Sequence, residues 1–263
     1  MRATCNDIEV AWFEVGRGKP LILVHGLADD HRAWRRALPD LMLRHRVLMY
    51  DLRGHGGTSL GRPEGTLRQL GADLAAFMEA TGVEGAHIAG FSLGGTIAMR
   101  MAIDHPARVR GLVLVATSSR VGRVAADWYR QRVEMVERGD PELRETLDRD
   151  TADVYAESAS ELPDGLLIRG QSTADPRGYG NACAAMAALN ATPLDPELGG
   201  ISAPTLIVAS DKDRHCPPKA AEIIAAGIKG SRLEIIPGAG HPIPVERPRE
   251  LAASINSFLA EID

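Results

Sequence analysis

The sequence predicts an α/β protein with a mostly parallel central sheet, helices on both faces of the sheet and a helical cap inserted between two strands. Three observations lead to this prediction. Short apolar runs alternate with helical patterns, which is typical of parallel strands buried on both faces. The strand pattern stops after Ser119 and resumes at Ile201, which indicates an insertion. A glycine-flanked serine stands between one strand and the following helix.

The predicted strands are short and rich in branched apolar residues. In chain order they are Ile8–Val15, Leu21–Val24, Val47–Tyr50, His87–Ala89, Leu112–Val115, Leu206–Ala209 and Arg232–Ile236. Helical spacing is found between them and after them, over Leu67–Ala80, Gly95–Ala102 and Arg249–Glu261. We see no internal repeat and no low-complexity stretch, so the chain is predicted to form one large α/β domain with its insertion.

Residues 120–191 are charged and helical, with no strong strand pattern. Amphipathic helices are predicted over Ala125–Arg138 and Pro141–Ala156, and proline and glycine predict turns at 162–165 and 174–178. We therefore divide the chain into a core, residues 1–119 and 192–263, and a cap, residues 120–191. A cap in this position would shape the mouth of a pocket.

The glycine-flanked serine is Ser92, in Gly90-Phe91-Ser92-Leu93-Gly94. Small residues two positions before and after it allow the strand and the helix to approach closely around a sharp turn. That turn would expose the Ser92 hydroxyl at the N-terminus of a helix, where free N–H groups favour developing negative charge. The pattern predicts a nucleophilic serine.

A serine hydroxyl needs a histidine to accept its proton, and that histidine needs an acid to orient it. The candidate base is His241, in a glycine-containing loop after a predicted strand. The candidate acid is Asp213, which lies just past the strand 206–209. Asp211 stands on the same loop and is the alternative acid.

Acyl transfer also requires an oxyanion hole, which is built from N–H groups aimed at the developing charge. One donor would be the N–H of Leu93, the residue after the serine. The other would be the N–H of Leu27, in the loop after the strand 21–24, where Gly26 allows the backbone to turn. His25 is predicted to brace this loop rather than to take part in the chemistry.

With these residues the chain resembles the α/β-hydrolase-fold serine hydrolases over nearly its whole length. The resemblance includes the order Ser92, Asp213, His241. Other shared motifs are His25-Gly26, the segment Asp51-Leu52-Arg53-Gly54-His55-Gly56-Gly57-Thr58-Ser59, the loop Gly238-Ala239-Gly240-His241 and Glu246-Arg247-Pro248. The family implies that Asp51 and Arg53 tie loops together near the serine. It also implies an acid in a G-x-x-D loop, here Ser210-Asp211-Lys212-Asp213, which favours Asp213.

Within this family the chain most resembles 3-oxoadipate enol-lactonases and small carboxylesterases. The segments that carry this resemblance are 128–133, 181–186 and 190–194. The R-W-F patch of the enol-lactonases is replaced here by Arg149-Asp150-Thr151, so the resemblance favours an esterase over an enol-lactonase proper. A serine at the turn also differs from the aspartate that haloalkane dehalogenases and epoxide hydrolases use.

The predicted activity is hydrolysis of a carboxylic ester or lactone through an acyl-enzyme, with a small molecule as the substrate. It requires no metal and no organic cofactor. Three alternatives stay open: 3-oxoadipate enol-lactonase proper, a perhydrolase or acyltransferase that uses an acceptor other than water, and a ligand-binding receptor with vestigial hydrolysis. In the cap, Trp128 either lines the pocket or anchors the cap to the core. A substrate carboxylate would need a cation, and Arg120, Arg123, Arg130 and Arg132 are available, although each is typical of a solvated helix face.

Composition excludes other classes of function. The net charge of −5 and scattered basic residues argue against a nucleic-acid partner. No apolar run approaches the roughly 20 residues of a membrane helix, and no signal-peptide pattern precedes the first strand, so we expect a cytoplasmic protein. Three cysteines, Cys5, Cys183 and Cys216, are typical of reduced thiols. The sequence does not indicate an oligomeric state.

Overall fold

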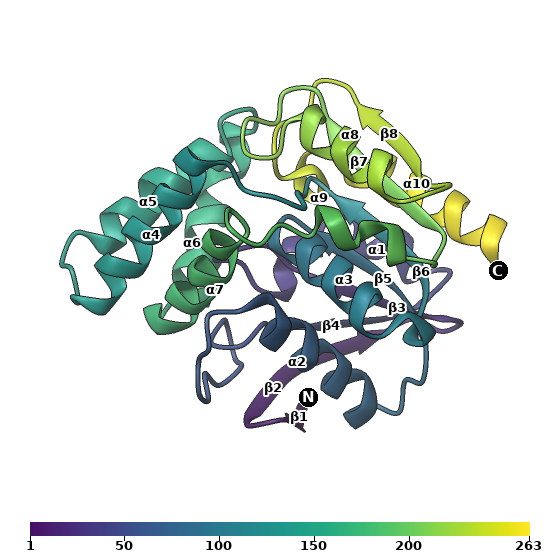
Figure 1. The fold of residues 1–263 in the computed structure, drawn as a ribbon, viewed down its shortest axis with the longest axis horizontal. Coiled ribbons are helices and arrows are strands. Elements are labelled where there is room, and N and C mark those ends of the chain that lie inside the picture. The colour runs from purple at the N-terminus through teal and green to yellow at the C-terminus, as the bar shows by residue number, and fades with distance from the viewer.

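The computed structural model describes all of residues 1–263 and contains an eight-stranded sheet (Figure 1). The strand order is β1-β2-β4-β3-β5-β6-β7-β8, and neighbours from β4 to β8 run parallel. β1 and β2 add an antiparallel edge beside β4. The strands are β1 Arg2–Cys5, β2 Ile8–Val15, β3 Pro20–Val24, β4 Arg46–Tyr50, β5 Ala86–Phe91, β6 Val109–Val115, β7 Thr205–Ser210 and β8 Arg232–Ile236.

Helices cover both faces of the sheet because both faces of its central strands are apolar. Along β3, Ile22 and Val24 enter one hydrophobic cluster, whereas Leu21 and Leu23 enter the other. The first cluster includes residues of α2, α3 and α8, and the second includes residues of η1, α1, α9 and α10. The bounds are η1 His31–Trp34, α1 Leu38–Leu41, α2 Leu67–Ala80, α3 Leu93–Asp104, α8 Pro218–Gly227, α9 Ile243–Glu246 and α10 Pro248–Ile262. None of the helices has the length and apolar character needed to cross a bilayer.

Four helices lie between β6 and β7 in the chain and form a group at one side of the molecule (Figure 1). They are α4 Arg123–Glu137, α5 Leu143–Val154, α6 Leu162–Ser172 and α7 Pro176–Ala188. Their own hydrophobic cluster includes Met135, Leu147 and Tyr179, together with Ala28 from the loop after β3. The division into a core and a cap at residues 120 and 191 remains a prediction, but this contact places α4, α5 and α7 against a loop of the candidate site.

Two local predictions from the sequence are wrong, and one strand was not predicted. Residues 162–165 and 174–178 were expected to be turns, yet they contain the first turns of α6 and α7. The reason is that Pro163 and Pro176 stand at the start of each helix, where the missing N–H costs no hydrogen bond and the fixed φ angle favours a helix. The strand β1 was not predicted, although it pairs with β2 through a two-residue turn at Asn6 and Asp7.

The loop after β4 is braced by buried polar groups, as the family resemblance implies. Arg53 donates two hydrogen bonds to Asp73 on α2, at 2.8 and 2.7 Å, and one to the carbonyl of Leu60. Asp51 accepts hydrogen bonds from the ring of His31, at 2.7 Å, and from the N–H of Gly57. These contacts tie the loop to its neighbours.

His55, in the same loop, makes folding sensitive to acid. Its side chain is buried, and burial, followed by the charge of His25, lowers its pKa to about 4. The unfolded chain, with an ordinary histidine pKa, binds the proton more readily, so stability falls as the pH drops from 6.5 to 4. We expect His55 to contribute about 3 kcal/mol to the fall in the free energy of unfolding between pH 7.5 and pH 4.

Urea unfolding at a series of pH values tests this expectation. In His55→Gln, the loss of unfolding free energy over that range should be smaller than in the wild type by about this amount. Equal losses in both proteins would contradict the prediction.

Candidate active site

Ser92 lies in a strained turn between β5 and α3. Its backbone has a φ of 54°, in the left-handed region that non-glycine residues rarely adopt. A Cβ atom on Gly90 would collide with the carbonyl of Gly94, and one on Gly94 would collide with the carbonyl of Val24. The turn is held from β6, because the N–H of Ser92 donates to the carbonyl of Val115 at 2.9 Å. The two glycines thus permit a turn that presents the partly exposed Ser92 side chain at the carboxyl end of β5.

The structure brings Ser92, His241 and Asp213 together from positions far apart in the sequence. The distance from Ser92 Oγ to His241 Nε2 is 3.0 Å. The distance from His241 Nδ1 to Asp213 Oδ2 is 2.8 Å. The loop that carries His241 is fixed on both sides: the N–H of Gly240 donates to Glu246, and the carbonyl of Gly240 accepts a hydrogen bond from Ser210, each at 2.6 Å. A hydroxyl, an imidazole and a carboxylate are thereby held in a chain of hydrogen bonds.

Asp213 is the acid that contacts the histidine. Its second oxygen, Oδ1, accepts hydrogen bonds from the N–H groups of His215 and Cys216, both at 2.8 Å. Burial would raise the pKa of Asp213, but the charge and hydrogen bond of His241 and these two N–H groups outweigh burial and hold the pKa below its usual value. The carboxyl is therefore ionised at neutral pH. Asp211, the alternative, instead accepts a hydrogen bond from the N–H of Gly238 at 2.7 Å.

The loop after β3 lies directly against the serine. A Cβ atom on Gly26 would lie 3.2 Å from the Cβ of Ser92 and 3.1 Å from the ring of Phe91, so a larger residue would push these side chains away. The N–H of Leu27, which follows, donates to no acceptor within the protein. Leu93 is the first residue of α3, so its N–H has no acceptor within the helix. Both predicted oxyanion donors therefore flank the serine and are available.

His25 has the bracing role that the sequence predicts. Its Nε2 accepts a hydrogen bond from the N–H of Leu52, and its Nδ1 lies 2.8 Å from the carbonyl of Gly26, to which it donates. Both ring nitrogens are used within the protein. The side chain is fully buried, and it fixes the backbone that carries the N–H of Leu27.

Tyr129, rather than Trp128, is the aromatic residue of α4 that packs inward. The Tyr129 side chain packs against two hydrophobic clusters, the one that contains Ile22 of the sheet and the one that contains Met135. Leu27 packs against the same two clusters. The ring of Trp128 is covered by the guanidinium of Arg132, whose carbon lies 4.3 Å from the ring centroid. The pocket role of Trp128 remains a prediction, and Tyr129 is the residue of α4 that sequence reasoning missed.

Three of the four arginines that the sequence offered as pocket cations are engaged in ion pairs. Arg120 pairs with Asp195, Arg130 with Asp127 at 2.6 Å, and Arg132 with Asp150 at 2.7 Å. The fourth, Arg123, is exposed. Arg120, Arg123 and Arg130 thus lie on the charged surface of the protein, whereas Arg132 is buried.

A second histidine stands beside the candidate base. The ring centroids of His215 and His241 are 5.0 Å apart, and His215 Nε2 lies 3.3 Å from Asp153 on α5. Burial, followed by the charge of His241, lowers the pKa of His215. Sequence reasoning assigned His215 no role, because nothing in its local pattern indicates contact with Asp153, 62 residues earlier in the chain.

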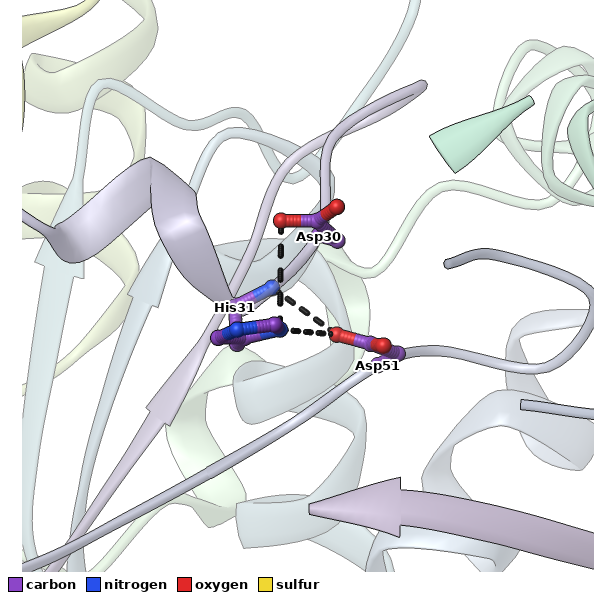
Figure 2. A group of neighbouring side chains, drawn as sticks. All are labelled: Asp30, His31 and Asp51. Atoms are coloured by element: carbon purple, nitrogen blue, oxygen red, sulfur yellow. Dashed lines mark hydrogen bonds and ion pairs between the residues drawn. The ribbon is translucent and has the colours of Figure 1, made fainter. Parts of the chain in front are cut away.

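Asp30, His31 and Asp51 form a cluster that resembles a metal site in composition (Figure 2). Its acceptors are already used by the protein. Asp30 pairs with Arg32 at 2.6 Å, and Asp51 accepts hydrogen bonds from both the ring and the N–H of His31. The cluster therefore serves to hold η1 against the loop after β4.

The chain is similar to known hydrolases over almost its full length. It is 29% identical over 252 residues to a protein of Variovorax paradoxus provisionally named as the carbamate hydrolase RutD, and the match covers 93% of each chain. It is also 29% identical to the 3-oxoadipate enol-lactonase 1 of Acinetobacter baylyi, over 92% of this chain and 89% of that one. The crystal structure of the enol-lactonase from Burkholderia xenovorans superposes with a TM-score of 0.88 at 25% identity, over 99% of this chain and 100% of that one. Residues 19–248 match the family model of the α/β-hydrolase fold, and the chain therefore belongs to the α/β-hydrolase family.

Proposed function

We propose that this protein is a serine hydrolase that cleaves a carboxylic ester or a lactone through an acyl-enzyme. The observation that carries the proposal is the chain of hydrogen bonds from Ser92 through His241 to Asp213, with distances of 3.0 and 2.8 Å. These are the distances expected of a nucleophile, its base and the acid that orients the base.

In the acylation step, Ser92 Oγ attacks the substrate carbonyl carbon while its proton passes to His241 Nε2. Asp213 accepts the Nδ1–H of His241, which leaves Nε2 unprotonated before the attack and stabilises the imidazolium after it. The N–H groups of Leu27 and Leu93 stabilise the oxyanion, and one such donor typically contributes about 10²- to 10³-fold in kcat. His241 then protonates the leaving oxygen as its bond to carbon breaks.

In the deacylation step, His241 Nε2 accepts a proton from water, and the resulting hydroxide adds to the acyl-enzyme carbonyl. The same two N–H groups hold the second oxyanion. Its collapse breaks the bond to Ser92 Oγ, which regains its proton from His241. The carboxylic acid leaves, and the three side chains return to their starting state.

The names of the relatives support acyl hydrolysis and leave the leaving group open. One relative is named as an enol-lactonase and another provisionally as a carbamate hydrolase. A carbamate would be attacked by the same three residues and would pass through a carbamoyl-enzyme instead of an acyl-enzyme. We favour esters and lactones, because the nitrogen of a carbamate donates electron density to the carbonyl carbon. That donation slows both the attack of Ser92 and the hydrolysis of the carbamoyl-enzyme.

The experiment compares p-nitrophenyl esters from acetate to dodecanoate with a lactone series and an aryl carbamate. We expect multiple turnovers on the esters and a transient acyl adduct on Ser92, seen by mass spectrometry after rapid quenching. An adduct that forms but does not turn over would favour the receptor alternative. Products of transfer to methanol or hydrogen peroxide in preference to water would favour the transferase alternative. Turnover of the carbamate alone would replace esters as the substrate class, and turnover without any Ser92 adduct would contradict the proposal.

A further inference from the structure

Arg169, on α6, is a buried cation without a partner in the protein. Only 9% of its surface is exposed. Its Nε is fully buried and makes no hydrogen bond. The guanidinium donates no hydrogen bond to any residue, and no carboxylate oxygen lies within the 4.0 Å of an ion pair. Because a buried charge is costly unless it is paired, this arrangement needs an explanation.

The other buried arginines show how this protein normally satisfies such a group. Arg53 pairs with Asp73 at 2.7 Å, Arg100 with Glu197 at 2.9 Å and Arg132 with Asp150 at 2.7 Å. Each of these three donates through at least two of its nitrogens. Arg169 differs from all three. The lack of a partner is therefore specific to Arg169 and is not shared by the other buried arginines.

That position is beside the candidate active site. Ser172, one helical turn after Arg169, donates its hydroxyl to the carbonyl of Asp29, and its own carbonyl accepts from the N–H of Gly56 at 2.9 Å. These bonds seat the end of α6 on the loops after β3 and β4. Asp29 is two residues beyond Leu27, the candidate oxyanion donor. Arg169 therefore projects from a helix that is fastened to the oxyanion loop.

The groups around Arg169 include one carboxyl, that of Asp29, which does not pair with it. Burial raises the pKa of Asp29, and the charge of Arg169 opposes that rise, followed by the smaller effect of His25. The same charge acts with burial and His241 to lower the pKa of His215. The remaining neighbours that sense its charge are Tyr155, Tyr179 and Cys183, all uncharged at neutral pH. None of these groups forms a hydrogen bond or an ion pair with the guanidinium of Arg169.

We propose that Arg169 binds a carboxylate of the substrate, so that the preferred substrates are esters or lactones that also carry a free carboxylate group. A guanidinium presents a planar pair of N–H donors that matches a carboxylate in a bidentate arrangement. In the complex with such a substrate, the carboxylate would be the ion-pair partner that Arg169 does not have within the protein. This inference rests on the proposed function and adds a substrate class to it.

The test compares half-esters with neutral esters of equal length. The substrates are the mono-p-nitrophenyl esters of glutarate, adipate and suberate, and the p-nitrophenyl esters of pentanoate, hexanoate and octanoate. We expect the wild type to prefer one or more of the half-esters. In Arg169→Gln, kcat/KM should fall about 10- to 100-fold for the preferred half-ester, mainly through KM, and by less than about threefold for its neutral counterpart. Arg169→Lys should recover part of the loss, because it retains the charge but not the fork.

Arg138→Gln is the matched control, because Arg138 lies on the exposed end of the cap and pairs with Glu134. It should alter neither substrate series. A second measurement needs no variant: adipate should inhibit hydrolysis of the neutral ester by the wild type, and adipamide should not.

Equal losses on both series in Arg169→Gln would assign Arg169 a packing role and overturn the inference. So would a wild type that neither prefers half-esters nor is inhibited by adipate. Failure of the proposed function would look different, because neutral esters would then not be turned over, or their turnover would not depend on Ser92.

Discussion

Replacing Ser92 by alanine is expected to lower kcat for ester hydrolysis by at least about a thousandfold. Without Oγ there is no atom to form the acyl-enzyme, and only binding and the two oxyanion donors remain. The fold should be preserved, because alanine has the same Cβ as serine and meets the same backbone at a φ of 54°. Steady-state hydrolysis of the best p-nitrophenyl ester measures the loss, and thermal unfolding of the variant checks the fold.

Ser257→Ala is a suitable control, since Ser257 is exposed on α10 and its hydroxyl contacts only Glu261. It should retain normal kcat. If the Ser92→Ala variant unfolds like the wild type and hydrolyses the ester at a similar rate, another group is the nucleophile.

The sheet around the site could be predicted because its strands are buried on both faces. In Leu21–Val24 and Leu112–Val115, every side chain must be apolar, so the strands appear as unbroken apolar runs. β1 was not predicted because it is not buried on both faces. It is a short edge strand, mostly exposed and polar, and only its pairing with β2 makes it a strand.

The geometry of Ser92, His241 and Asp213 was predictable from motifs because each residue lies in a loop at the end of a strand. The parallel order of the sheet brings these loops to one edge. The choice between Asp211 and Asp213 depended on a family pattern, and the structure gives its physical content: Asp213 contacts the histidine, and Asp211 contacts a backbone N–H of the neighbouring loop.

The position of Arg169 could not be predicted from the sequence. Arg169 lies in α6, whose first turn looks like a loop in the sequence because of its proline and glycine. Which side of that helix faces the loop after β3 depends on contacts such as Ser172 with Asp29, which join residues 143 positions apart. A local sequence pattern does not indicate such distant contacts. In the sequence, an arginine without a partner therefore cannot be distinguished from the other arginines of a charged helix.

Asp213→Asn is the second change for which we expect a very large effect, a fall in kcat of about 10⁴-fold. The amide oxygen of asparagine would still accept hydrogen bonds from the N–H groups of His215 and Cys216, as Asp213 Oδ1 does at 2.8 Å. Its NH₂ group would then face His241 Nδ1 and donate to it. That arrangement leaves the proton of the neutral imidazole on Nε2. A protonated Nε2 cannot accept the proton of Ser92.

Asp211→Asn makes the same chemical change two residues away and is therefore the sharpest control. Asp211 accepts one hydrogen bond from the N–H of Gly238 at 2.7 Å, which an amide oxygen can also accept. We expect kcat to change by less than about threefold, since no proton transfer involves this side chain. The kcat values of the two variants for ester hydrolysis decide between the two acids. Thermal unfolding of each variant checks that both are folded. The reverse result, a large loss in Asp211→Asn and a small one in Asp213→Asn, would mean that the loop rearranges when substrate binds and that Asp211 orients the histidine.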